Sequence, residues 1–125
     1  MQVLKTEGFN NIFHVDVFEK EFCSLFGKSK GEMKRYQNWL DRSLGILDEL
    51  GVQATDNKTF RKISGYEDLY EIRYPHSKLN TRVLYCILLD DGEVILLAAT
   101  KEKESSDVSS AAELAARRLR LLKEG

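Results

Sequence analysis

The 125-residue sequence has few cysteines and no long apolar run, and each absence excludes a class of protein. Cys23 and Cys86 lie far apart and lack CxxC or cysteine–histidine spacing. This argues against a zinc site or a disulfide framework and predicts two buried thiols. No window approaches the ~20 apolar residues of a membrane span, and the first residues lack the apolar run of a signal peptide. We therefore expect a cytoplasmic protein without membrane contact.

The sequence also has no large excess of charge of one sign. It contains nineteen lysines and arginines and twenty aspartates and glutamates, which gives a formal net charge of −1. Attraction to phosphates would have to come from a local patch. The sequence has a single proline, Pro75, no internal repeat and 42% hydrophobic residues. This composition predicts one packed domain over residues 1–125 that folds without a metal or cofactor.

The first half of the chain predicts a strand and two helices. Residues 12–18, IFHVDVF, alternate as a strand that should pair with a later one. A short helix over residues 19–26 is broken by GKSKG, and a second helix over residues 32–50 has apolar side chains at helical spacing and Gly51 as its terminator. The two helices are expected to form a hairpin.

The second half predicts strands and one more helix. Extended segments occur at TFRKI, at residues 69–74 and at residues 81–89, and EVILLAAT follows the strong hairpin signal Asp-Asp-Gly. A helix over residues 108–123 has Asp107 or Ser110 as candidate caps. This order predicts an α+β fold, with a small antiparallel sheet, an N-terminal helix pair and a C-terminal helix.

Three stretches carry a family resemblance: KISGYEDLYEIRY, NTRVLYCILLDDGEVILLAATKEK and the final RRLRLL. They resemble the RelE/ParE toxin superfamily, and in detail its phage-derived HigB-like branch. That branch has a Lys-x-Leu/Ile-x-Gly element, Leu-Tyr-Glu-Leu-Arg, a Tyr-Arg-Val strand, an Asp-Gly hairpin and paired lysines before the last helix. The resemblance covers about half of the chain in detail and nearly all of it in element order. It implies a RelE-like fold and the toxin of a type II toxin–antitoxin pair.

The resemblance implies an endoribonuclease that needs no metal and cuts messenger RNA on the ribosome. Arg73 and Arg82 match the family's phosphate-gripping arginines, and alternation places both on one face that we expect to be open and concave. Alternatively, Arg73 pairs with Glu71 or another exposed carboxylate and only holds the sheet surface together. Lys62 matches a family lysine that acts as base or phosphate ligand, or it is a solvated lysine at a strand end.

Lys101 and Lys103 match the family's paired lysines, but here glutamates interleave with them. A carboxylate such as that of Glu102 would repel a phosphate, or it would accept a proton. His76 is a candidate acid–base group, against the alternative of an exposed loop histidine. The chain has no tyrosine or histidine after residue 100, where several RNA-cutting relatives use one, which counts against proficient catalysis.

Basic side chains on two predicted helices are candidates for RNA binding, against the alternative of solvated helix faces. They are Lys34, Arg35, Arg117, Arg118 and Arg120, with Lys28, Lys30 and Lys123 nearby. The implied partners are a cognate helix-turn-helix antitoxin, messenger RNA and the ribosome, and the oligomeric state is left open. Two other functions fit: a ParE-like toxin that binds DNA gyrase without catalysis, and a catalytically decayed module that only binds antitoxin.

Overall fold

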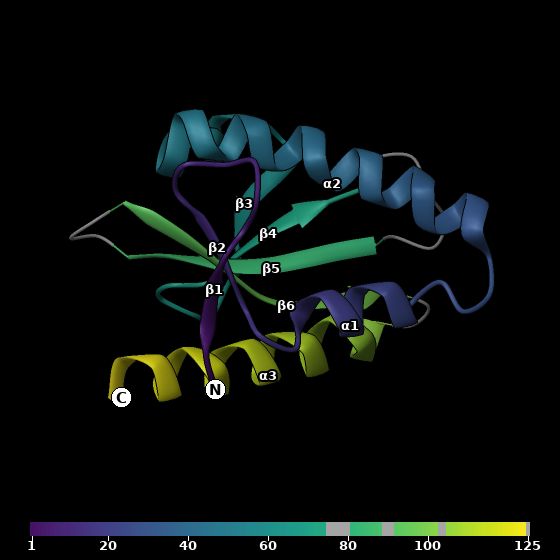
Figure 1. Ribbon diagram of the computed structural model, residues 1–125. Helices are drawn as coiled ribbons and strands as arrows, with labels where there is room; N and C mark the ends of the chain where they lie inside the picture. Colours follow the sequence, from purple (N-terminus) through teal and green to yellow (C-terminus); the bar gives the residue numbers. More distant parts are fainter. Residues whose placement is uncertain (75–80, 89–91, 103–104, 125) are drawn as a thin grey trace.

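The computed structural model describes residues 1–74, 81–88, 92–102 and 105–124. The chain forms a six-stranded sheet with helices on both faces (Figure 1). The strands, in chain order, are β1 (Val3–Lys5), β2 (Ile12–Val15), β3 (Phe60–Lys62), β4 (Tyr70–Arg73), β5 (Thr81–Leu88) and β6 (Glu93–Lys101). The helices are α1 (Phe18–Ser24), α2 (Lys30–Leu50), the 3-10 helix η1 (Gly51–Asp56) and α3 (Ser105–Glu124).

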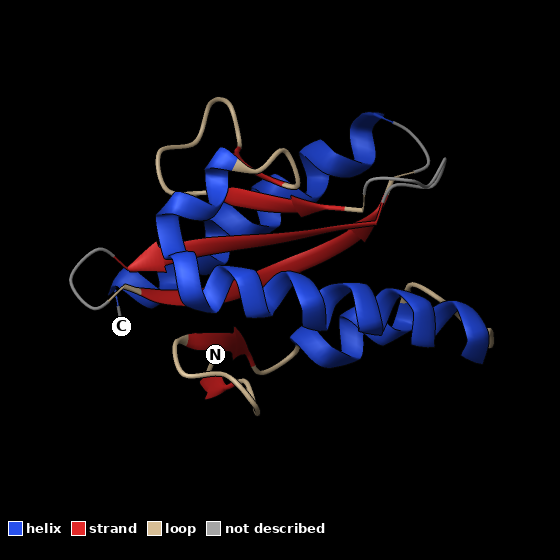
Figure 2. Cartoon of the chain, turned by 90° about the horizontal axis from the view of Figure 1, so that it is seen from above, coloured by secondary structure: helices blue, strands red, loops and turns tan. Residues whose placement is uncertain are grey.

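The strands lie in the order β1-β2-β6-β5-β4-β3. All neighbours pair antiparallel except β2 and β6, which run parallel with Ile12 opposite Val94. Helix α2 lies over one face of the sheet and α3 under the other, while α1 runs opposite to α2 beside β6 (Figures 1 and 2). The predicted α+β class, with its helix pair and C-terminal helix, is confirmed.

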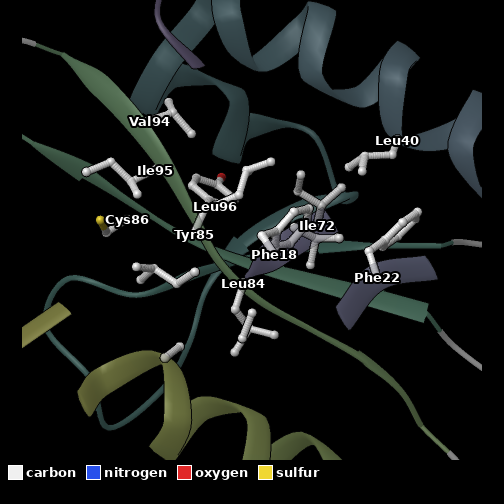
Figure 3. Packing of buried hydrophobic residues seen from close by; sticks show 14 of the residues in the cluster. Phe18, Phe22, Leu40, Ile72, Leu84, Tyr85, Cys86, Val94, Ile95 and Leu96 are labelled. Carbon is white, nitrogen blue, oxygen red and sulfur yellow. The ribbon is translucent and has the colours of Figure 1, made fainter. Parts of the chain in front are cut away.

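The core occupies both faces of the central strands. Every residue from Thr81 to Cys86 in β5 is buried, and Figure 3 shows the apolar side chains that surround this strand. On one face, the Tyr74 ring packs against the rings of Tyr36 and Trp39 of α2, with centroids 4.7 and 5.5 Å apart. Because side chains alternate along a strand, the next residue inward, Arg73, projects toward the opposite face, which α3 covers in part.

Most element boundaries agree with the sequence patterns, and the differences have local causes. The Ser29 hydroxyl accepts a hydrogen bond from the Glu32 backbone amide at 3.3 Å, and α2 therefore begins at Lys30. Helix α3 begins at Ser105, so the predicted caps Asp107 and Ser110 lie inside the helix and not at its N-terminal boundary. Residues 89–91 of the predicted hairpin lie outside the described residues.

The two cysteines lie in different environments. Cys86 on β5 is buried, and burial raises the pKa of its thiol to about 12, which keeps it protonated at any ordinary pH. Cys23 on α1 is only half-buried, so the prediction of two buried thiols is wrong for this residue. No helix within the described ranges is long and apolar enough to cross a membrane.

Candidate active site

Three arginines and two glutamates gather on the α3 side of strands β3, β4 and β5. The register places Arg61 of β3 opposite Glu71 of β4, and Arg73 of β4 opposite Arg82 of β5. Glu102 follows the last residue of β6 and contacts Arg82. We call these five residues the arginine cluster. Its formal charges leave an excess of one positive charge.

Glu71 is the centre of the arginine cluster. Its side chain is only 2% exposed, and its two carboxylate oxygens accept hydrogen bonds from Arg82 Nη1 at 3.2 and 3.0 Å. Arg61 Nε donates to the same carboxylate from the rim of the sheet. A carboxylate buried to this degree is tolerated only when it is paired and hydrogen-bonded, and the two guanidinium groups supply both.

Arg82 is held by two carboxylates. Besides its contact with Glu71, its Nη2 donates to Glu102 at 2.7 Å, and its side chain is only 8% exposed. Its Nε is buried and has no hydrogen-bond partner among the described residues. The prediction that Arg82 projects from an open face is therefore wrong, because packing on the α3 side covers this part of the sheet. The ion pair with Glu71 that we considered for Arg73 is made by Arg82.

Arg73 differs from its neighbours in having no carboxylate within ion-pair distance among the described residues. Its side chain is half-buried, and its backbone amide donates to the Thr59 carbonyl at 2.8 Å, which fixes the strand at this position. Two like charges on directly opposed residues, here Arg73 and Arg82, destabilise a sheet unless an anion lies near them. The carboxylate of Glu71, which pairs with Arg82, offsets part of this repulsion, and the arrangement leaves room for Arg73 to bind a further anion.

Sequence reasoning missed Arg61. The alternation of TFRKI was sufficient to find it, because Phe60 is buried and the next side chain must project to the other face. Arg61 is the most exposed member of the arginine cluster, since 51% of its side chain is accessible to solvent.

The predicted lysines lie away from the arginine cluster. Lys62 is opposite Tyr70 in the β3–β4 register, so it projects toward the α2 side, and it is exposed. Lys101 also projects to that side, where its Nζ pairs with Glu32 of α2 and lies 5.7 Å from the centre of the Phe26 ring. The structure therefore does not bring these two lysines together with the arginines. His76 and Lys103 lie outside the described residues and stay predictions.

Comparisons with known proteins agree with this arrangement at the level of the fold. No protein-family model matches the sequence, and neither does any curated protein. Among solved structures, the chain is similar to that of the E. coli toxin RelE, an arginine-to-alanine double mutant in the free state. The TM-score is 0.53 and the identity 19%, over 82% of this chain and 93% of that chain. The chain has a RelE-like fold.

The candidate RNA-binding residues occupy two faces of this RelE-like fold. Lys34 and Arg35 are exposed on α2, and Arg117 and Arg120 are exposed on α3. Because the two helices cover opposite faces of the sheet, the four side chains do not form one patch. No set of three histidine, cysteine, aspartate or glutamate side chains in the described ranges is placed to hold a metal ion.

Arg118, the fifth candidate, joins three elements of the RelE-like fold. Its guanidinium donates to both carboxylate oxygens of Glu21 on α1, at 2.7 and 2.6 Å, and to the Leu97 carbonyl of β6 at 2.7 Å. The hydrogen bond to Glu21 is the main reason that the Arg118 pKa is raised. Strand β2 pairs with β6 only as far as Leu96, so Arg118 satisfies the first carbonyl beyond that pairing. Its contacts are those of a residue that stabilises the fold.

Replacing Arg118 with alanine is expected to lower the free energy of unfolding by about 2 kcal/mol, since a bidentate, mostly buried contact is lost and the Leu97 carbonyl is left without a donor. Urea denaturation followed by circular dichroism measures this difference. Arg117→Ala is the matched control, because Arg117 is exposed on the same helix and should change stability by less than about 0.5 kcal/mol. Equal effects of the two substitutions would contradict the assigned role.

Proposed function

We propose that the chain is the toxin of a type II toxin–antitoxin pair and that it cleaves messenger RNA on the ribosome at the arginine cluster. The observation that carries the proposal is the gathering of Arg61, Arg73 and Arg82 on one side of adjacent strands in a RelE-like fold. Guanidinium groups bind phosphate oxygens in pairs and keep their charge at every working pH. The chain has a net charge of −1, so attraction to RNA phosphates requires a local positive patch, and the arginine cluster has one excess positive charge.

The proposed reaction is an internal transfer at one phosphate of the RNA backbone. The ribose 2′-oxygen forms a bond to the phosphorus and loses its proton to a base, and the bond from the phosphorus to the 5′-oxygen breaks as that oxygen takes up a proton. The products are a 2′,3′-cyclic phosphate and a 5′-hydroxyl. Negative charge accumulates on the phosphate oxygens during the transfer, so preorganised cations at that point lower the barrier.

The arginines have different proposed roles because their surroundings differ. Arg73, half-buried and without an ion pair to a described carboxylate, is the proposed ligand of the reacting phosphate. Arg61, at the exposed rim, contacts the neighbouring phosphate of the chain. Arg82 is a positioning residue, since its guanidinium is enclosed by Glu71 and Glu102. Lys62 and Lys101 project to the other face of the sheet and are not proposed as acid or base. His76 and Lys103, which lie outside the described residues, remain the candidates for these roles.

The carboxylate of Glu102 either repels the phosphate or accepts a proton during the reaction, and a substitution at this position distinguishes the two roles. The Glu102 side chain is 24% exposed, against 2% for Glu71, so it is the carboxylate of the cluster nearer to solvent and to an incoming phosphate. We expect Glu102→Gln to raise the rate of RNA cleavage severalfold, because the substitution removes a negative charge that repels the phosphate. Single-turnover cleavage of ribosome-bound messenger RNA measures this rate, with Glu49→Gln on the exposed side of α2 as the matched control. A lower rate would instead identify Glu102 as the proton acceptor.

The proposed partners follow from the same function. A cognate antitoxin with a helix-turn-helix domain would cover the cluster, and the exposed Lys34, Arg35, Arg117 and Arg120 would contact ribosomal RNA. Mapping of RNA 5′ ends after induction of the chain tests the proposal directly. Discrete cuts within translated codons are expected, and growth arrest without any new 5′ ends would overturn it.

A second function is favoured by one observation: carboxylates already contact Arg61 and Arg82. A non-enzymatic toxin, such as a ParE-like binder of DNA gyrase, needs no open phosphate site. It predicts growth arrest with inhibited supercoiling and intact RNA. A decayed module that only binds an antitoxin predicts no growth effect.

A further inference from the structure

A pocket of about 310 Å³ opens between α1, α2, β2 and the loop from residue 6 to residue 11, and none of the residues that line it belongs to the arginine cluster. Its volume is at the lower end of the range of small-molecule sites. The floor is apolar and aromatic, and includes Phe9, Phe18, Phe22 and Leu40. Figure 3 shows Leu40 on α2 and Phe22 on α1 with their side chains in the space between the two helices. The floor therefore suits a flat apolar group.

The charges around this pocket are of one sign. Glu7, Glu19 and Asp41 line it, and no lysine or arginine is present among the described residues that do so. Asp41 accepts a hydrogen bond from Gln37 at 3.0 Å, which directs its carboxylate along the pocket side of α2. Aromatic faces and carboxylates together attract organic cations, through the ring quadrupole and through charge pairing.

A buried histidine supplies a polar group inside the pocket. His14 of β2 is 6% exposed, and its Nδ1 lies 2.8 Å from the Thr6 hydroxyl. Its Nε2 has no hydrogen bond among the described residues, and its nearest charged neighbour is the Glu19 carboxylate at 3.8 Å. His14 Nε2 is not among the fully buried side-chain atoms that lack a hydrogen bond, so this ring nitrogen is open to the pocket and can hydrogen-bond to a group bound there.

The wall formed by residues 6–11 is fixed in place. The backbone amide of Thr6 donates to the Ile12 carbonyl at 2.9 Å, and the amides of Asn10 and Asn11 donate to the Asp48 carboxylate at 3.0 and 2.7 Å. Asp48 lies near the end of α2, so the loop is tied to the helix that forms the opposite wall. The pocket is thus formed before any ligand arrives, which lowers the ordering cost of binding.

We propose that this pocket binds a small organic cation with a flat apolar body, such as an aromatic amine, at a site separate from the arginine cluster. The aromatic floor receives the ring of the ligand. The ammonium group is placed among Glu7, Glu19 and Asp41, and His14 Nε2 faces it from the wall. Anions are disfavoured here by the same three carboxylates.

Three probes that share an indole ring and differ in charge test the proposal: tryptamine, tryptophol and indole-3-acetate. Isothermal titration of the full chain is expected to show tryptamine binding on the order of tenfold more tightly than tryptophol, since a charge pair and a cation–π contact are added. Indole-3-acetate should bind most weakly. Equal affinity for tryptamine and tryptophol, or tightest binding of indole-3-acetate, overturns the proposal.

Two pairs of variants place the binding in this pocket. Gln37→Trp puts a large side chain at the half-buried rim and should abolish tryptamine binding, whereas Asn38→Trp, exposed on the same helix, should leave it unchanged. Asp41→Asn should weaken tryptamine about fivefold and leave tryptophol unaffected, with Glu49→Gln as the neutral control. Tryptamine binding that survives both Gln37→Trp and Asp41→Asn in folded protein overturns the assignment. RNA cleavage is not needed for either readout.

Discussion

Cells that express the Arg73→Ala variant are expected to grow normally, and the purified variant is expected to cleave RNA about 10²–10³-fold more slowly than the wild type. Arg73 is the half-buried cation of the cluster that has no ion pair to a described carboxylate. Removing a preorganised donor from the charge that develops in a transition state costs a factor of this size. Growth curves after induction and single-turnover cleavage of ribosome-bound messenger RNA measure the two effects.

Two further variants sharpen the test of Arg73. Arg73→Lys keeps the charge but loses the planar pair of donors, and should fall between the wild type and alanine. Arg42→Ala removes an exposed arginine of α2 that belongs to neither proposed surface, and should arrest growth like the wild type. If Arg73→Ala arrested growth as fully as the wild type, with equal amounts of folded protein, the assignment of the site would be wrong.

The second large effect concerns stability. Replacing Glu71 with alanine is expected to lower the free energy of unfolding by about 3–5 kcal/mol, because it leaves the buried Arg82 with only the partly exposed Glu102 as a counter-charge. Arg61 loses its partner as well, but its exposed guanidinium is solvated at little cost. Urea denaturation measures the change.

A double variant tests whether the loss in Glu71→Ala comes from an unpaired buried charge or from lost packing. Glu71→Leu/Arg82→Met removes both buried charges together, and its free energy of unfolding should be restored to near that of the wild type. Glu102→Gln should cost far less than Glu71→Ala, since Glu102 is more exposed. Equal costs for Glu71→Ala and Glu102→Gln would show that Glu71 does not compensate Arg82.

The sequence predicted which side chains share a face but not which faces are covered. Alternation in LYEIRY places Arg73 on the side opposite Tyr74, and the contacts of Tyr74 with α2 bear this out. The same pattern says nothing of what lies above a face, so the burial of Glu71 and Arg82 could not be read from it. Burial depends on where α3 docks, and that docking depends on contacts between distant residues.

Two other features of the fold could not be predicted from the sequence, for a different reason. The strand β1 has only three residues, VLK, which is too short for an alternating pattern, and all three are exposed. The parallel pairing of β2 with β6 joins segments that lie far apart in the sequence, and neither segment carries a signal for its partner. Within the site, the glutamate at position 102 departs from the family pattern, and the structure gives it a definite contact with Arg82.

The parallel pairing of β2 and β6 has a consequence for how the protein is made. During synthesis strand β2 leaves the ribosome long before Val94, Ile95 and Leu96, the residues it must pair with. Pairing between such distant segments is slow, and an unpaired apolar strand edge is prone to association. The sheet is therefore completed only when nearly the whole chain is available, and a nascent chain that ends before β6 cannot assemble the finished fold around its arginines.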